Sequence, residues 1–182
     1  SNEKYRFLHI STLDANKNFQ GVLDACAILK EKNILNWHFT VVSEEDFSAF
    51  EKWTQMNELV EHFTFLSHVP HEILPEFYLT HDCFVLNSNK ETFSIVNAEA
   101  LCMGLHLITT PVGFVGSEKN EVYDLVAFNS PQDLAEKMEN SLQLKKRNNA
   151  LGREFVAKFR EDRVLDSYDQ LYQTVIKEAK TV

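Results

Sequence analysis

The spacing of two glutamates is the first feature of the sequence that suggests a binding or catalytic role. Glu91 and Glu99 stand eight positions apart. If both were on one helix, they would be separated by roughly 12 Å along the helix axis and by about 80° around it. Carboxylates placed in this way suit contacts to a long ligand better than work on a single bond. Such spacing is common by chance, so the pair alone assigns no function. Glu91 could equally compensate a helix dipole, and Glu99 could lie at the edge of the core.

The segment from residue 83 to residue 113 is predicted to position both acids. It has the pattern of a strand, a polar loop, a helix, a second strand and a glycine turn. Thr92 or Ser94 can cap the helix, and Gly104 stands where a left-handed residue ends it. A strand-helix-strand unit of this length is a right-handed crossover that builds a parallel sheet. The predicted strands are 83–86 and 105–109, and the loops at their carboxyl ends are 87–92 and 110–117.

A lysine, Lys17, is predicted to lie at the same edge of the sheet. Residues 5–10 have the pattern of a buried strand, residues 11–17 of a polar loop, and residues 19–32 of a helix. Lys17 therefore stands at or just before a helix N-terminus, where backbone N–H groups already favour an anion. The helix dipole slightly disfavours a cation there, which hints at an anionic partner. The alternative is a lysine that is simply solvated.

The rest of the chain continues the alternation of strands and helices. Ser43, followed by Glu44, Glu45 and Asp46, is interpreted as an N-cap with an acidic first turn, so these acids are assigned to helix stability rather than catalysis. About six strands that alternate with helices predict a Rossmann-like α/β domain with a parallel sheet. The remaining predicted strands are 37–42, 63–66 and 122–128, and the remaining helices are 43–56, 70–79, 131–144 and two within 150–180 that are broken near 160–162.

Length and composition narrow the class of protein. The 182 residues, 44% of them hydrophobic, suffice for one well-cored domain covering residues 1–182. A net charge of -9 argues against nucleic acid as a partner, because binding to phosphate backbones needs a basic face. The cysteines Cys26, Cys83 and Cys102 stand in apolar runs and are expected to be core residues.

Nothing in the sequence indicates a membrane or secreted protein. No stretch approaches 18 consecutive apolar residues, and the N-terminus lacks a secretion signal, so we expect no transmembrane segment and a cytoplasmic location. Ser1 and Asn2 resemble the scar of a cleaved tag, and residues 1–4 are expected to lie outside the fold.

Residues 91–104, with the sequence ETFSIVNAEALCMG, resemble the E-x7-E signature of the retaining GT-B glycosyltransferases, which include sucrose and glycogen synthases. The likeness continues in residues 9–17, 81–85 and 109–113, and about Tyr5 to Ile176 aligns in order with the C-terminal, donor-binding half of that fold. The first strand-helix loop has no glycines, which makes a dinucleotide site of the NAD or FAD type improbable.

The resemblance implies a role for each residue of the predicted site. Glu99 would accept hydrogen bonds from the ribose hydroxyls of a nucleotide-diphosphate sugar, and Glu91 would lie near the anomeric centre of the sugar. Lys17 would neutralise the diphosphate, the task that a metal ion performs elsewhere, and the absence of an Asp-x-Asp sequence agrees with metal-independent transfer and no cofactor. The other donor-binding residues implied are Thr92, Phe93, Ser94, Gly113, Phe114, Thr12 and Ser88.

The resemblance also implies that the acceptor-binding N-terminal domain is missing. We therefore expect the isolated chain to bind a nucleotide sugar but to transfer it poorly, and any peripheral contact with a membrane to be made through the missing half. Departures from the family keep alternatives open. Ser11 and Thr12 replace a Gly-Arg pair, and Asn18 and Ser94 replace glycines. A non-catalytic, glycosyltransferase-like binding or assembly module is thus the alternative function. A receiver-type signalling domain is disfavoured, because residues 66–68 offer no aspartate.

Overall fold

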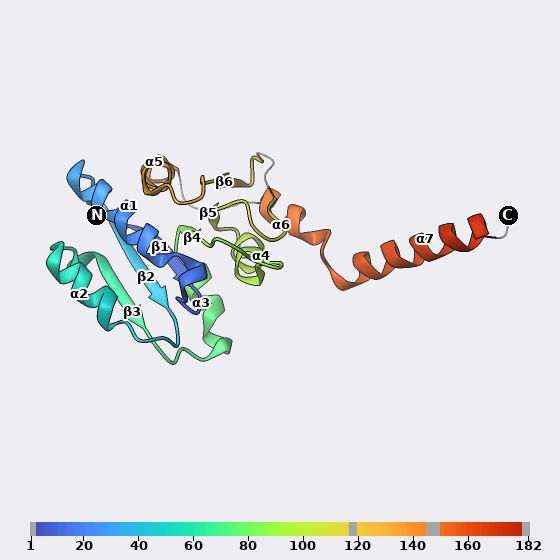
Figure 1. The fold of residues 1–182 in the computed structure, drawn as a ribbon, viewed down its shortest axis with the longest axis horizontal. Coiled ribbons are helices and arrows are strands. Elements are labelled where there is room, and N and C mark those ends of the chain that lie inside the picture. The colour runs from blue at the N-terminus through green and yellow to red at the C-terminus, as the bar shows by residue number, and fades with distance from the viewer. Residues whose placement is uncertain (1–2, 117–119, 145–149, 180–182) are drawn as a thin grey trace.

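The computed structural model describes residues 3–116, 120–144 and 150–179. Its strands are β1 (Tyr5–Ile10), β2 (Trp37–Val42), β3 (Phe63–Leu66), β4 (Cys83–Leu86), β5 (His106–Thr109) and β6 (Tyr123–Leu125). They form one parallel sheet in the order β3-β2-β1-β4-β5-β6 (Figure 1). The predicted α/β fold with six parallel strands is confirmed. The order of the strands reverses between β1 and β4, and ligands of such sheets bind at that point, outside the carboxyl ends of the strands.

Helices cover both faces of the sheet. They are α1 (Phe19–Glu31), α2 (Ser48–Met56), α3 (Leu74–Thr80), α4 (Ile95–Cys102), α5 (Pro131–Ser141), α6 (Ala150–Ala157) and α7 (Glu161–Ala179), with short 3-10 turns at η1 (Ala15–Lys17), η2 (Val60–His62) and η3 (His71–Ile73). Side chains of α1, α2 and α5 pack on one face, and those of α3, α4 and α6 pack on the other. Strand β4 is buried along its whole length, as expected for a central parallel strand.

The start of α2 differs from the prediction. Ser43 does not cap this helix, because its N–H donates to the carbonyl of Leu66 and extends the pairing of β2 with β3. Its hydroxyl accepts from the N–H of Glu45, within a loop. The helix begins only at Ser48, where Asp46 accepts from the backbone N–H. The three acids therefore precede the helix rather than form its first turn.

Other helix ends agree with the sequence. Gly104 has a φ of 78° after α4, and the Leu105 N–H donates to the carbonyl of Ala100 across that turn. Ser130 caps α5 by accepting from the N–H of Asp133, although the helix ends at Ser141 rather than near residue 144. The predicted break between the last two helices is confirmed, because α6 ends at Ala157 and α7 begins at Glu161.

Two further details correct the sequence-based expectations. Strand β6 covers only residues 123–125, since the chain turns at Asn129, which has a φ of 53°, to enter α5. Cys26 and Cys83 are buried as expected, but Cys102 is exposed on the surface of α4.

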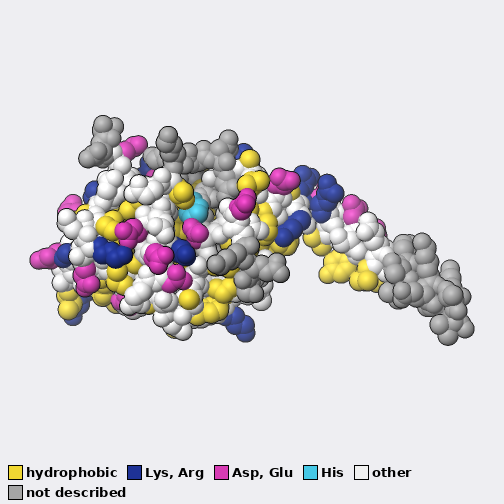
Figure 2. All heavy atoms as spheres, turned by 90° about the horizontal axis from the view of Figure 1, so that it is seen from above, with side chains coloured by type: hydrophobic (Ala, Val, Ile, Leu, Met, Phe, Trp, Pro, Cys, Tyr) yellow, Lys and Arg dark blue, Asp and Glu magenta, His cyan; other side chains and the backbone are white. Residues whose placement is uncertain are grey.

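The last helix, α7, extends away from the body of the domain (Figure 1). Its exposed apolar side chains recur at helical spacing and form an apolar stripe, part of which Figure 2 shows as a yellow patch. The stripe consists of Val164, Leu165, Tyr168, Leu171, Tyr172 and Ile176, which are between 37% and 62% exposed. In the described part of the chain, no helix is long and apolar enough to cross a membrane.

Candidate functional site

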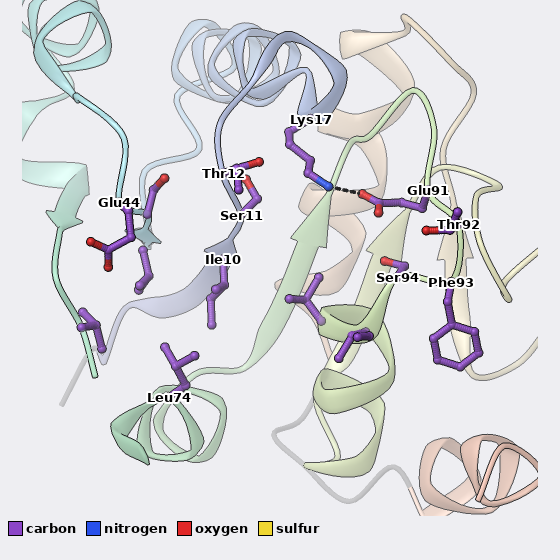
Figure 3. A pocket seen from close by; sticks show the side chains of 15 residues that line it. Ile10, Ser11, Thr12, Lys17, Glu44, Leu74, Glu91, Thr92, Phe93 and Ser94 are labelled. Atoms are coloured by element: carbon purple, nitrogen blue, oxygen red, sulfur yellow. Dashed lines mark hydrogen bonds and ion pairs between the residues drawn. The ribbon is translucent and has the colours of Figure 1, made fainter. Parts of the chain in front are cut away.

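A pocket of about 460 Å³ lies at the carboxyl edge of the sheet (Figure 3). It is lined by the loops that follow β1, β2 and β4 and by the first turn of α4, so it occupies the point where the strand order reverses. Six of the predicted site residues line it, namely Thr12, Lys17, Glu91, Thr92, Phe93 and Ser94. Ser88, Glu99, Gly113 and Phe114 do not line this pocket.

Lys17 and Glu91 form an ion pair inside the pocket. The Lys17 Nζ lies 2.7 Å from Glu91 Oε1, and the two side chains are 18% and 12% exposed (Figure 3). The hydroxyl of Ser88 donates to the same carboxylate oxygen at 2.8 Å. Glu91 precedes α4 and is not helical, so the separation calculated for two glutamates on one helix does not apply.

The local structure of the first loop brings Lys17 to this position. Asp14 caps the turn η1 by accepting from the N–H of Asn16, and Lys17 is the last residue of that turn. Asn18 then takes the left-handed conformation, with a φ of 46°, at a position where the sequence comparison expected glycine. Asparagine tolerates this conformation better than most residues. The left-handed backbone conformation between η1 and α1 is therefore kept without glycine.

Hydrogen bonds join the two loops that carry the ion pair. The Asn16 side-chain amide donates to the carbonyl of Lys90 at 2.6 Å, and the Asn89 N–H donates to the carbonyl of Asn16 at 2.7 Å. Thr12, which was expected to contact the donor, donates its hydroxyl to Asp14 at 2.7 Å. These hydrogen bonds thus tie the two loops together beside Lys17 and Glu91.

A buried histidine beneath the first loop was not predicted as part of the site. The Nδ1–H of His9 donates to the carbonyl of Val85 at 2.8 Å, and its Nε2 accepts from Ser11 at 2.7 Å. This assignment follows because a carbonyl can only accept. Burial lowers the pKa of His9 to about 4, so the ring is neutral at pH 7. Its signals in the sequence were its polar type within a buried strand and its place in the matching segment 9–17.

The N-terminus of α4 presents free hydrogen-bond donors to the pocket. The backbone N–H groups of Thr92, Phe93 and Ser94 donate no hydrogen bond to any described residue. Ser94, one of the two predicted candidates, occupies the N-cap position with a φ of 69°, although its side chain makes no capping hydrogen bond. Its hydroxyl is buried, and within the described residues it has no partner. This arrangement can bind an oxyanion such as a phosphate.

The glycine turn after β5 packs against Phe93, one of the residues that line the pocket. Gly113 has a φ of 63°, and an added Cβ would lie 2.4 Å from the carbonyl oxygen of Phe93. The next residue, Phe114, donates its N–H to that oxygen at 3.2 Å. The Phe114 ring packs on Phe93 and on Phe159, with centroids 5.1 Å apart in both cases. Gly113 and Phe114 therefore fix the position of Phe93.

Glu99 lies in a neighbouring pocket of about 330 Å³ between α3 and α4. Leu74 and Ile95 line both pockets, so the two are adjacent. The Tyr78 hydroxyl donates to Glu99 Oε2 at 2.8 Å. No local pattern in the sequence indicates this partner, because the two residues stand 21 positions apart on different helices.

Two further observations concern Glu44 and the possibility of a metal site. Glu44, which the sequence assigned to helix stability, lines the first pocket and lies 2.8 Å from the Nδ1 of His68. Among the described residues, no cluster of three or more His, Cys, Asp or Glu side chains could hold a metal ion.

Comparison with known proteins identifies relatives of this chain. A protein of Klebsiella pneumoniae described as an uncharacterized 41.2 kDa protein in the cps region is 23% identical over 176 residues, which are 94% of this chain and 47% of that protein. The sucrose-phosphate synthase of Thermosynechococcus elongatus shares the fold with a TM-score of 0.77 and 22% identity, over 98% of this chain and 47% of the synthase. The chain thus spans about half the length of these relatives.

A second similar structure is itself a single domain. It is the C-terminal domain of a glycosyl transferase group 1 family protein, LpcC, from Francisella tularensis, with a TM-score of 0.70 and 22% identity over 85% of both chains. The predicted resemblance to the C-terminal half of a GT-B glycosyltransferase is confirmed. Residues 1–155 match the family described as "Glycosyl transferases group 1". The chain belongs to the group 1 glycosyl transferase family.

Proposed function

We propose that this chain binds the nucleotide-diphosphate sugar of a retaining, metal-independent glycosyltransferase. One observation carries the proposal. A single pocket is lined both by the cation of Lys17 and by residues 92–94 at the start of α4, whose backbone N–H groups donate to no described residue. A diphosphate needs such a combination of a mobile positive charge and fixed amide donors.

The neighbouring residues support roles for the rest of the donor. Glu91 lies beside Lys17, where it would face the sugar attached to the diphosphate. Glu99 lies in the adjoining pocket, where its carboxylate would accept from the ribose. In this proposal Lys17 also stabilises the charge that develops on the leaving diphosphate, without a metal ion. An acceptor-binding domain would complete the enzyme, because the relatives are about twice as long as this chain.

A non-catalytic binding or assembly module is the second candidate. It is favoured by Thr12, which stands where the family has arginine and whose hydroxyl is engaged by Asp14. Among the described residues, Lys17 is the only lysine or arginine that lines the pocket. A site with one cation would hold a diphosphate less tightly than a site with two.

Thermal unfolding with UDP, GDP, ADP and their hexose conjugates tests the proposal. A ligand at 100 times its Kd should add ~2.7 kcal/mol of stability to the wild-type chain. We expect Lys17→Ala to abolish most of this gain. The matched control is Lys32→Ala, which removes a lysine that also forms a 2.7 Å ion pair, with Glu139 on the surface. No gain with any nucleotide in the wild-type chain would contradict the proposal and favour the binding module.

A further inference from the structure

Tyr78 has an environment that fixes both its ring and its hydroxyl. The side chain is on α3 and is only 2% exposed. Its ring packs against Phe84 of β4, with centroids 5.8 Å apart. Burial and the nearby carboxylate of Glu99 raise the pKa of Tyr78, so the phenol keeps its proton and acts as a donor. The ring is therefore held by the sheet while the hydroxyl points at α4.

The partner of that hydroxyl, Glu99, has few other restraints. The Tyr78 hydroxyl lies 2.8 Å from Glu99 Oε2, and among the described residues it is the only hydrogen-bond donor to this carboxylate. Glu99 forms no ion pair with another described residue. A glutamate side chain rotates about three bonds, so a single bond from a rigid tyrosine decides where its carboxylate plane lies. Oε1 and one lone pair of Oε2 stay free to accept.

We propose that Tyr78 is a positioning residue, whose hydroxyl holds Glu99 so that the free lone pairs of the carboxylate accept from the 2′- and 3′-hydroxyls of a donor ribose. This inference rests on the proposed function. It adds that Tyr78 sets the preference of the site for ribonucleotides over 2′-deoxyribonucleotides. A vicinal diol offers two donors at a fixed separation, and a carboxylate meets both only in a restricted orientation.

A purely structural role for Tyr78 makes a different prediction. A buried phenol needs an acceptor, and Glu99 could serve only that need. Removal of the hydroxyl would then lower the melting temperature and leave the preference for the ribonucleotide over the 2′-deoxyribonucleotide unchanged. The ratio of the two affinities therefore separates the two roles.

The experiment uses the 182-residue chain and isothermal titration calorimetry. UDP, GDP and ADP are titrated first, and the nucleotide that binds most tightly is then compared with its 2′-deoxy counterpart and with inorganic pyrophosphate. We expect the wild-type chain to prefer the ribonucleotide by about tenfold, as loss of a hydrogen bond to a charged group implies. In Tyr78→Phe the preference should fall to about threefold or less, through weaker binding of the ribonucleotide. Affinity for pyrophosphate, which has no ribose, should not change.

The matched control is Tyr5→Phe. Tyr5 is also a buried tyrosine, 8% exposed, but it lies at the amino end of β1, on the opposite edge of the sheet. This variant should keep the wild-type ratio. Unchanged binding of pyrophosphate by Tyr78→Phe also shows that the variant is folded.

A second variant tests the carboxylate that Tyr78 holds, in case Tyr78→Phe is unstable. Glu99→Gln keeps the shape of the side chain and removes its charge, and it should abolish the ribose preference with Tyr78 intact. Two results would overturn the inference while leaving nucleotide binding established. One is an unchanged ratio of ribonucleotide to 2′-deoxyribonucleotide affinity in Tyr78→Phe. The other is equal binding of these two nucleotides by the wild-type chain. Absence of binding by every nucleotide and by pyrophosphate would overturn the proposed function as well.

Discussion

Lys17 and Glu91 neutralise each other in the pocket, so a diphosphate that enters must compete with Glu91 for the same ammonium group. This competition predicts the effect of Glu91→Gln. With the negative charge removed, Lys17 needs a new counterion, and we expect inorganic pyrophosphate to bind about three- to tenfold more tightly. The unliganded variant should lose about 1 kcal/mol of stability, because its lysine is left without a partner. Calorimetric titration and urea unfolding measure the two effects.

The control for this variant is Glu58→Gln, which breaks the 2.8 Å ion pair of Lys30 with Glu58 outside the pocket. It should leave the affinity for pyrophosphate unchanged. Weaker binding of pyrophosphate by Glu91→Gln would show that Glu91 helps to hold the anion rather than competing with it.

His9 makes the stability of the domain depend on pH. Its pKa of about 4 in the folded state lies below the ordinary value of 6.5, so the unfolded chain binds a proton that the folded chain does not. Stability is therefore complete above pH 6.5 and falls as the pH is lowered from 6.5 towards 4. Between pH 7.5 and pH 5.0, His9 should account for a loss of about 2 kcal/mol.

Urea unfolding of the wild-type chain and of His9→Gln at these two pH values measures this loss. The other titrating groups are common to both proteins and cancel in the comparison. The variant should be less stable at pH 7.5, because Val85 and Ser11 lose their partner, but it should lose about 2 kcal/mol less on acidification. An equal loss in both proteins would assign the pH dependence to other residues.

Sequence reasoning at the residue scale predicted that Lys17 and Glu91 lie at one edge of the sheet, but not which residues hold them there. Lys17 and Glu91 follow different strands, and the parallel topology alone brings those strand ends to one edge. The Tyr78 hydroxyl and the His9 ring act through bonds to residues 21 and 76 positions away, which no local spacing records. Such partners depend on how α3 and β4 pack, so they could be found only from the structure.

At the scale of elements, the sequence predicted β1, β2, β4 and β5 well, because their apolar runs are almost entirely buried. It failed at the start of α2, where a serine before three acids has the usual pattern of a cap. Ser43 donates its N–H to the carbonyl of Leu66 in β3 instead of capping the helix, because a buried N–H at the end of a strand must be satisfied. The start of α4 likewise keeps a left-handed residue although glycine is replaced by Ser94.

The turn after β5 gives a prediction at this scale. Gly113→Ala should destabilise the domain by about 2–4 kcal/mol, because the residue has a φ of 63° and its new methyl group would collide with the carbonyl of Phe93. Since Phe93 then has to move, pyrophosphate affinity should also fall. Chemical denaturation and calorimetric titration check the two effects.

Gly116→Ala is the matched control for this turn. Gly116 has nearly the same φ, 65°, but an added Cβ would meet no atom of the described residues within 4 Å. Gly116→Ala should therefore lose only the energy of placing alanine in the left-handed conformation, about 1 kcal/mol, and its affinity for pyrophosphate should not change. Equal losses of stability in the two variants would show that close approach to Phe93 is not what requires glycine at position 113.

At the scale of the whole molecule, the domain is a closed unit from β1 to α6, and α7 lies outside it (Figure 1). The chain ends its contact with the sheet at α6, where Val156 is buried and Phe155 and Phe159 join the aromatic cluster with Phe114. The sequence predicted both last helices and the break between them. It left open whether their aromatic residues serve the core or a surface, since an apolar stripe at helical spacing has the same pattern in both cases.

Two truncations decide how the terminal helices contribute. The chain 1–160, which lacks α7, should differ from the full chain by less than about 1 kcal/mol, because the apolar stripe of this helix is already exposed to water. The chain 1–149, which also lacks α6, should lose about 3 kcal/mol or more, because Val156 and the phenylalanines that support Phe114 leave the core. Urea unfolding followed by the fluorescence of Trp37 and Trp53 measures both. Equal losses would mean that α7 stabilises this domain as much as α6 does. A loss confined to 1–149 would leave the stripe on α7 as a surface that the domain itself does not use.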